Sequence, residues 1–192
     1  YNSAFGYISL SSNTTGTNNT GIGYNAQVPS GIANNQVRIG NTSVTYAGVQ
    51  VAWTITSDRR WKSNISNSNL GLSFISKLRP VSYTRNNDES GKNEYGFIAQ
   101  EIEEVLKEEN VENTGMLTVT DEGMYEFRYN DLLAPLVKAI QELKTENDKL
   151  KNNNDRLSAE VESLRPISSK LAKLEQLVIE LSVAKNVSLK EK

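Results

Sequence analysis

The sequence predicts an α+β protein with a fibrous β-stem, and three observations support this fold class. A repeat of 17 residues marks the N-terminal part, which is rich in Asn, Ser, Thr and Gly. A segment of short strand-like and helix-like patterns follows, and the C-terminal part carries leucines at heptad spacing. We therefore predict a stem over 1–56, a small α+β domain over 57–130 and coiled-coil helices over 131–192.

The stem prediction depends on the repeat, in which an apolar residue precedes Gly6, Gly23 and Gly40. A unit with one or two apolar side chains cannot bury its own hydrophobic face, so it must stack on its neighbours or on other chains. We predict an intertwined, trimeric β-stem, with glycine where backbones approach closely or φ is positive. A polar linker with a chance similarity is the alternative.

Apolar residues alternate with others between Gln36 and Ile55, which predicts two or three strands that lead to Ser57. From Asp58 onward the pattern changes to that of a mixed domain. A short apolar cluster that ends before Pro80 predicts a helix. The expected elements after it are a strand over 81–84, a return strand over 95–99, a helix over 100–109 and a hairpin over 116–129.

The heptads predict a parallel, in-register coiled coil. Leucines 143, 150, 157 and 164 occupy d, and Ile140, Asn147, Asn154 and Val161 occupy a. Glutamates at g, 146 and 160, precede Lys151 and Arg165 at e by five residues, the spacing of pairs between parallel chains. Pro166 is expected to break the helix, with a second helical segment after it. Asparagine at a is more typical of a coiled coil of two helices than of three, but the β-stem favours a homotrimer.

Composition excludes several classes of function. With no Cys and no His, thiolate zinc sites, Cys–His dyads and Ser–His–Asp triads are impossible. A formal charge of −2 offers no basic surface for nucleic acid. No apolar run approaches the roughly 20 residues of a membrane span. We expect no cofactor, no metal, no nucleic acid and no membrane span.

The junction after the stem contains a candidate nucleophile and base. Only one charged residue, Arg38, precedes Ser57, and Lys62 follows Ser57 by five positions. Serine is a poor nucleophile without a positioned base, and lysine can act as one where burial favours its neutral form. A turn of this length can bring the amine back to the hydroxyl. A surface pair without a catalytic role is the alternative.

The residues from Thr56 to Ile65 resemble the S-D-x-R-x-K-x-x-I start of the peptidase S74 family. This family comprises the C-terminal intramolecular chaperone domains of phage tailspikes, endosialidase-type fibres and neck appendages, and is similar to the self-cleaving domain of the myelin regulatory factor family. Three later blocks resemble the family's L-x-P-V-x-Y, G-x-x-A-Q-E and Y-x-x-L motifs, in order: Leu78–Tyr83, Gly96–Glu101 and Tyr129–Leu132.

The resemblance implies a trimeric chaperone that registers the upstream stem and is then released by autoproteolysis between Thr56 and Ser57. Ser57 would be the nucleophile of this serine endopeptidase, and Lys62 its general base. Candidate supporting residues are Asp58, Gln100 and Glu101. The implied setting is a virion tail fibre or spike, or an extracellular fibre, with the chaperone acting in the host cytoplasm during assembly.

Two alternatives remain open at the level of sequence. The same domain can stay uncleaved as a structural clamp or tip of a trimeric fibre or adhesin. A fibre tip that binds host surface glycan is the third hypothesis, in which Tyr24, Tyr46 and Trp53 stack on sugars.

Overall fold

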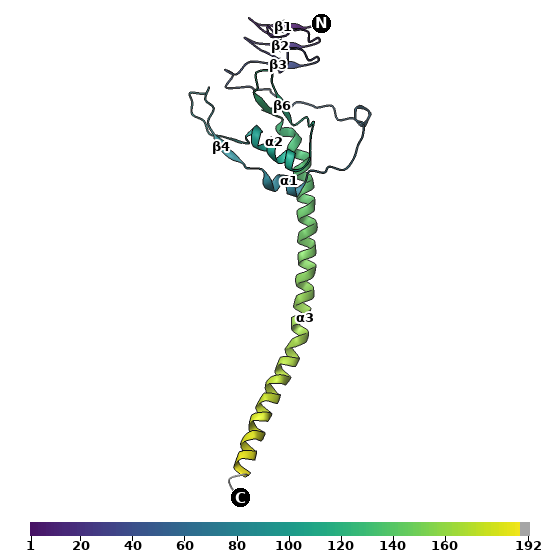
Figure 1. Cartoon of the computed structure of the whole chain (residues 1–192), viewed down its shortest axis with the longest axis vertical. Helices are drawn as coiled ribbons and strands as arrows, with labels where there is room; N and C mark the ends of the chain where they lie inside the picture. Colours follow the sequence, from purple (N-terminus) through teal and green to yellow (C-terminus); the bar gives the residue numbers. More distant parts are fainter. Residues whose placement is uncertain (189–192) are drawn as a thin grey trace. The chain divides into compact units, whose positions relative to one another are not determined.

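The structure, a computed structural model, describes residues 1–188 of the chain (Figure 1). The chain divides into two compact units with the boundary after Ile140. The first unit contains all of the strands and the helices α1 and α2, and the second consists of the greater part of α3.

The N-terminal repeats form a parallel three-stranded sheet within one chain. Its strands are β1 (Ser3–Phe5), β2 (Thr20–Ile22) and β3 (Val37–Ile39), in that order. Each residue pairs with the one 17 positions further on, as Ser3 does with Thr20 and Thr20 with Val37. The 17-residue repeat is therefore the unit of stacking. Because these hydrogen bonds join repeats of a single chain, the sheet forms without intertwining, and the three-chain stem remains a prediction.

Buried asparagine and close glycine contacts explain the composition of the repeats. Asn19 is fully buried, and its amide donates to Asn13 Oδ1 at 2.8 Å and to the Ala33 carbonyl at 2.9 Å. A side chain added at Gly6, where φ is 128°, would place Cβ 2.5 Å from the Gly23 carbonyl oxygen. The prediction that glycine serves close approach and positive φ is thus confirmed at Gly6.

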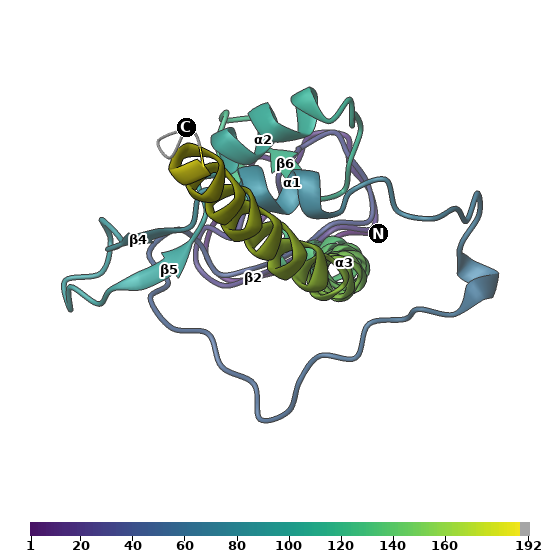
Figure 2. The same cartoon turned by 90° about the horizontal axis from the view of Figure 1, so that it is seen from below.

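The strands predicted after β3 are absent from the segment 40–58, all of which the structure describes, so that prediction is wrong for a single chain. The segment forms a wide loop that leads toward α1 (Figure 2). Val49, Val51, Trp53 and Ile55 keep the alternation of a strand but are 57%, 80%, 74% and 67% exposed. An isolated strand gains neither ladder hydrogen bonds nor burial, so the pattern alone does not order it.

The α+β elements agree with the predicted order. They are α1 (Leu72–Lys77), β4 (Val81–Tyr83), β5 (Glu94–Gly96), α2 (Ala99–Glu108), β6 (Leu117–Val119) and β7 (Tyr125–Phe127). The pairs β4–β5 and β6–β7 are both antiparallel. The core consists of Leu70, Phe74, Ile102, Leu106, Met116 and Leu132.

A short 3₁₀ turn, Tyr129–Leu132, leads into the long helix α3 (Leu133–Ser188). The helix continues through Pro166, so the predicted break there is wrong; proline removes one hydrogen bond to the preceding turn, and the turns on either side persist. The last residues of the predicted domain, 189–192, lie outside the described residues. Within the described part of the chain, neither α3 nor any other helix combines the length and apolarity of a membrane span.

Phe74→Ala is expected to lower the free energy of unfolding by about 3–5 kcal/mol, because Phe74 is fully buried at the centre of the core. Tyr95→Ala is the matched control, since Tyr95 is 80% exposed on β5 and its loss is expected to cost less than about 0.5 kcal/mol. Denaturant unfolding followed by circular dichroism measures both changes. Equal losses in the two variants would contradict the assignment of the core.

Candidate functional site

A single 3₁₀ turn, Arg59–Trp61, shapes the junction. Asp58 caps this turn, because its Oδ1 accepts a hydrogen bond from the Arg60 amide at 2.8 Å. The Lys62 amide donates to the Arg59 carbonyl at 3.0 Å and so closes the turn. The backbone therefore reverses its course between Ser57 and Lys62.

The turn brings the side chains of Ser57 and Lys62 together. Lys62 Nζ donates a hydrogen bond to Ser57 Oγ at a distance of 2.7 Å. This is the geometry that a proton transfer from hydroxyl to amine requires. Both residues are exposed in one chain, however, so one chain does not supply the burial that favours a neutral amine.

Asp58 is engaged by Arg60 rather than by the Ser57 hydroxyl. The guanidinium donates to Asp58 Oδ1 through Nε at 3.0 Å and to Oδ2 through Nη2 at 2.7 Å. Hydrogen bonds from the Arg60 side chain, and then from its backbone, hold the pKa of Asp58 below its ordinary value. Asp58 is therefore an ionised cap of the turn, and Lys62 is the group in contact with Ser57.

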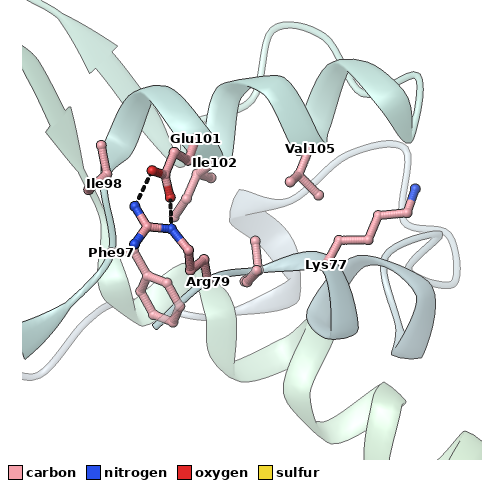
Figure 3. A pocket seen from close by; sticks show the side chains of 8 residues that line it. Lys77, Arg79, Phe97, Ile98, Glu101, Ile102 and Val105 are labelled. Carbon is pink, nitrogen blue, oxygen red and sulfur yellow. Dashed lines mark hydrogen bonds and ion pairs between the residues drawn. The ribbon is translucent and has the colours of Figure 1, made fainter. Parts of the chain in front are cut away.

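Gln100 and Glu101 lie in the first turn of α2, where a carboxylate is favoured by the helix dipole. Arg79 donates to Glu101 Oε2 through Nε at 3.0 Å and binds Oε1 through Nη2 (Figure 3). This hydrogen bonding by Arg79 lowers the pKa of Glu101. The pocket beside the pair measures about 30 Å³, far below the hundreds of cubic ångströms of a ligand site. In one chain Glu101 therefore joins α2 to the segment after α1, and its role at Ser57 stays a prediction.

The later motif blocks contact one another through Tyr129. The Phe97 amide donates to the Tyr129 hydroxyl at 3.1 Å, and the rings of Phe127 and Tyr129 lie 4.8 Å apart. A side chain at Gly96 would place Cβ against the same hydroxyl, so that the Tyr129 side chain would have to move. These contacts hold β5 beside the segment that precedes α3.

Sequence reasoning missed a second set of contacts, in which Glu126 of the β6–β7 hairpin pairs with Arg38 of the stem and Asp121 of the same hairpin binds the stem backbone at Gly31. Asp121 and Glu126 are separated from their stem partners by about 90 residues along the chain. The one signal available was that Arg38 is the single charged residue before Ser57.

Residues 57–111 match the Peptidase S74 family model, described as chaperone of endosialidase. This segment belongs to the Peptidase S74 family. The match begins at Ser57 itself and includes the first three of the four motif blocks, so the resemblance inferred from the motifs is confirmed over the segment. No match was found among curated proteins. The Peptidase S74 segment thus contains Ser57, Lys62, Arg79 and Glu101, whose contacts are described above.

The pair Arg79–Glu101 is expected to stabilise this Peptidase S74 domain at neutral pH but not in acid. Because the pKa of Glu101 is lowered in the folded protein, the stabilisation is complete above the ordinary glutamate value of about 4.3 and is lost as pH falls through the lower folded-state value. Arg79→Gln should therefore reduce the melting temperature slightly at pH 7.

The difference between Arg79→Gln and the unsubstituted protein should disappear as the pH falls below the lowered pKa of Glu101 and its carboxylate becomes protonated. Lys92→Gln is the control, since it removes the same charge from an exposed loop. Thermal melting across the pH range measures the effect. A deficit in Arg79→Gln that persists unchanged in acid would show that the pair acts through packing instead.

Proposed function

We propose that the chain is a self-cleaving intramolecular chaperone. Its part from Ser57 onward assembles three chains, registers the stem before it, and separates from that stem by cutting the Thr56–Ser57 bond. The observation that carries the proposal is the 2.7 Å hydrogen bond between Lys62 Nζ and Ser57 Oγ, at the residue where the family match begins.

In the proposed reaction, Ser57 Oγ attacks the carbonyl carbon of Thr56 while the neutral Lys62 amine accepts the hydroxyl proton. The Thr56–Ser57 amide bond breaks, the Ser57 nitrogen takes up a proton, and the Thr56 acyl group is left as an ester on Oγ. Water then hydrolyses the ester, which gives a Thr56 carboxylate and a chain that begins with Ser57. Asp58 keeps the turn closed throughout, because its carboxylate caps the Arg60 amide.

Assembly supplies the burial that a single chain lacks. Ser57 and Lys62 are exposed, and Trp61 and Ile65 beside them are 81% and 57% exposed. Apolar side chains next to a candidate base favour its neutral form once a neighbouring chain covers them. We therefore propose that cutting follows trimer formation, when the junctions of the three chains come into contact.

The helix α3 provides a surface for that assembly. The leucines at d, 143, 150, 157 and 164, are 50%, 56%, 48% and 52% exposed, so residues 1–188 do not cover their apolar seam. A parallel coiled coil buries such a seam and aligns the chains in register. It also raises the local concentration of the three stems, whose repeats alone specify register poorly.

Cutting makes the assembly of the stem irreversible. A stem whose contacts are non-local orders slowly, and the coiled coil accelerates it by holding the chains together. When the chaperone is removed, refolding can no longer start from the coiled coil, and the stem is stable kinetically. We place this process in a virion tail fibre or spike, or an extracellular fibre, with the chaperone acting in the host cytoplasm.

An uncleaved clamp is the second candidate function. It is favoured by the exposure of Lys62, because a solvated lysine is a poor base. Binding of a host surface glycan is a third candidate function, and it depends only on the exposed rings of Tyr24, Tyr46 and Trp53.

Ser57→Ala is expected to abolish cutting, and Lys62→Arg to slow it by at least about a hundredfold, because arginine cannot be deprotonated. Ser63→Ala is the control, since it removes a neighbouring exposed hydroxyl. Mass spectrometry of freshly expressed protein should detect a fragment that begins at Ser57 in the unsubstituted and control chains. An intact unsubstituted chain would favour the clamp, and rapid cutting in Lys62→Arg would exclude Lys62 as the base.

The Ser57→Ala chain is expected to form a trimer, with a mass about three times the 21.3 kDa of the chain by light scattering. Leu150→Lys should shift the protein toward monomer by placing a charge at d, and should slow cutting when Ser57 is restored. Asn152→Lys, at the outward f position of the same heptad, should do neither. A dimer would overturn the threefold assembly.

A further inference from the structure

We propose that the β6–β7 hairpin is a docking surface for the stem of its own chain, and that it holds stem and chaperone together after the backbone between them is cut. The occupant of this surface is the stem segment from Gln27 to Thr42. The docking contacts make cutting and release separate steps. They are present before the cut, and the inference rests on the proposed function only in that the contacts retain the stem after the cut.

The first contact is an ion pair between the stem and β7. Arg38 Nη2 donates to Glu126 Oε1 at 2.5 Å, and Arg38 Nε donates to the Gln27 carbonyl at 3.1 Å. The two charged side chains are 29% and 38% exposed, so the pair is partly shielded from solvent. Because Arg38 is the single charge in the first 56 residues, the hairpin contacts the one position where the stem offers electrostatic recognition.

The second contact is made by the turn of the hairpin. The Asp121 amide donates to the Pro29 carbonyl at 2.8 Å, and Asp121 Oδ2 accepts from the Gly31 amide at 2.8 Å. Asp121 therefore binds the stem backbone from both its own backbone and its side chain. This pair of bonds requires that Pro29–Gly31 has the folded conformation, so the hairpin recognises a folded turn of the stem.

A third contact comes from the loop between β4 and β5, where the Asn87 side-chain amide donates to the Thr42 carbonyl. A cavity of about 410 Å³ lies between the two parts, lined by Asn25 and Gln27 on the stem side and by Met124 on the hairpin side. The three contacts thus surround a hollow rather than a close-packed core. A boundary of this kind is held by its polar contacts more than by apolar burial.

None of these three contacts uses the junction between Thr42 and Ser57. Cutting the Thr56–Ser57 bond removes the covalent link but leaves Arg38–Glu126, the Asp121 bonds and Asn87–Thr42 in place. The cut parts therefore stay docked until the polar contacts are weakened. Salt weakens the ion pair, because it screens a partly exposed charge pair.

The test uses the full chain cut by an external protease, so that it does not depend on Ser57. A recognition sequence for a specific protease replaces residues 47–52 of the exposed loop, and Ser57→Ala prevents self-cutting. After the cut, size-exclusion chromatography at low salt measures whether the stem fragment elutes with the remainder. We expect co-elution at low salt and partial separation at about 1 M salt, where the screening length is near 3 Å.

Charge variants identify the contact that is responsible. Glu126→Arg should weaken retention about tenfold, because it places two cations against each other across the boundary. Glu112→Arg is the matched control, since it makes the same change at an exposed residue outside both the hairpin and the cavity. Exchange of the pair, Arg38→Glu with Glu126→Arg, should restore retention, which separates a lost contact from a misfolded hairpin.

Three results would overturn the docking surface. One is separation of the fragments at low salt in the chain without charge substitutions. Another is equal retention in Glu126→Arg and Glu112→Arg. The third is failure of the exchanged pair to restore retention. If the natural chain never cuts itself, the proposed function fails, while retention after the external cut still supports the docking surface.

Discussion

The packing of Phe74 against Ile102, Leu106 and Leu132 joins three segments of the chain into one small core. Phe74 lies in α1, where the junction loop ends; Ile102 and Leu106 lie in α2; and Leu132 directly precedes α3. The β6–β7 hairpin packs on the same core through Leu117 and Phe127. Because a close-packed core has few alternative arrangements, its formation determines where the junction returns and where the hairpin meets the stem.

Local patterns predicted the helices and strands whose formation depends on residues nearby in the sequence. The 3.6-residue period of α2 and the heptads of α3 are such patterns, and both helices are present. The 17-residue period predicted stacking but not its partner, because repeats of one chain or of several give the same period. Strand alternation in Val49–Ile55 was a poor guide, since a strand exists only with a neighbour. The effect of Pro166 was overestimated, because one missing hydrogen bond does not end a long helix.

The candidate site was predictable for the same reason. Ser57 and Lys62 are joined by one turn, so their spacing allowed the contact, and the family resemblance singled the pair out. Their catalytic role stays a prediction. By contrast, Arg79 and Glu101 are 22 residues apart, and Gly31 and Asp121 are 90 apart. Such partners meet only when the helices and strands have folded together, so no periodic pattern in the sequence predicts the contact. The family motifs located Glu101 but did not indicate its partner.

Exposure of the Ser57–Lys62 pair has a consequence for timing. An amine that donates a hydrogen bond to a hydroxyl cannot at the same time remove the proton of that hydroxyl. On the proposed function, the chain is therefore synthesised with the geometry of the pair in place but without reaction. Neighbouring chains would then cover the pair, so that assembly itself would act as the switch. A site that was already buried in one chain would cut before the stems had found their register.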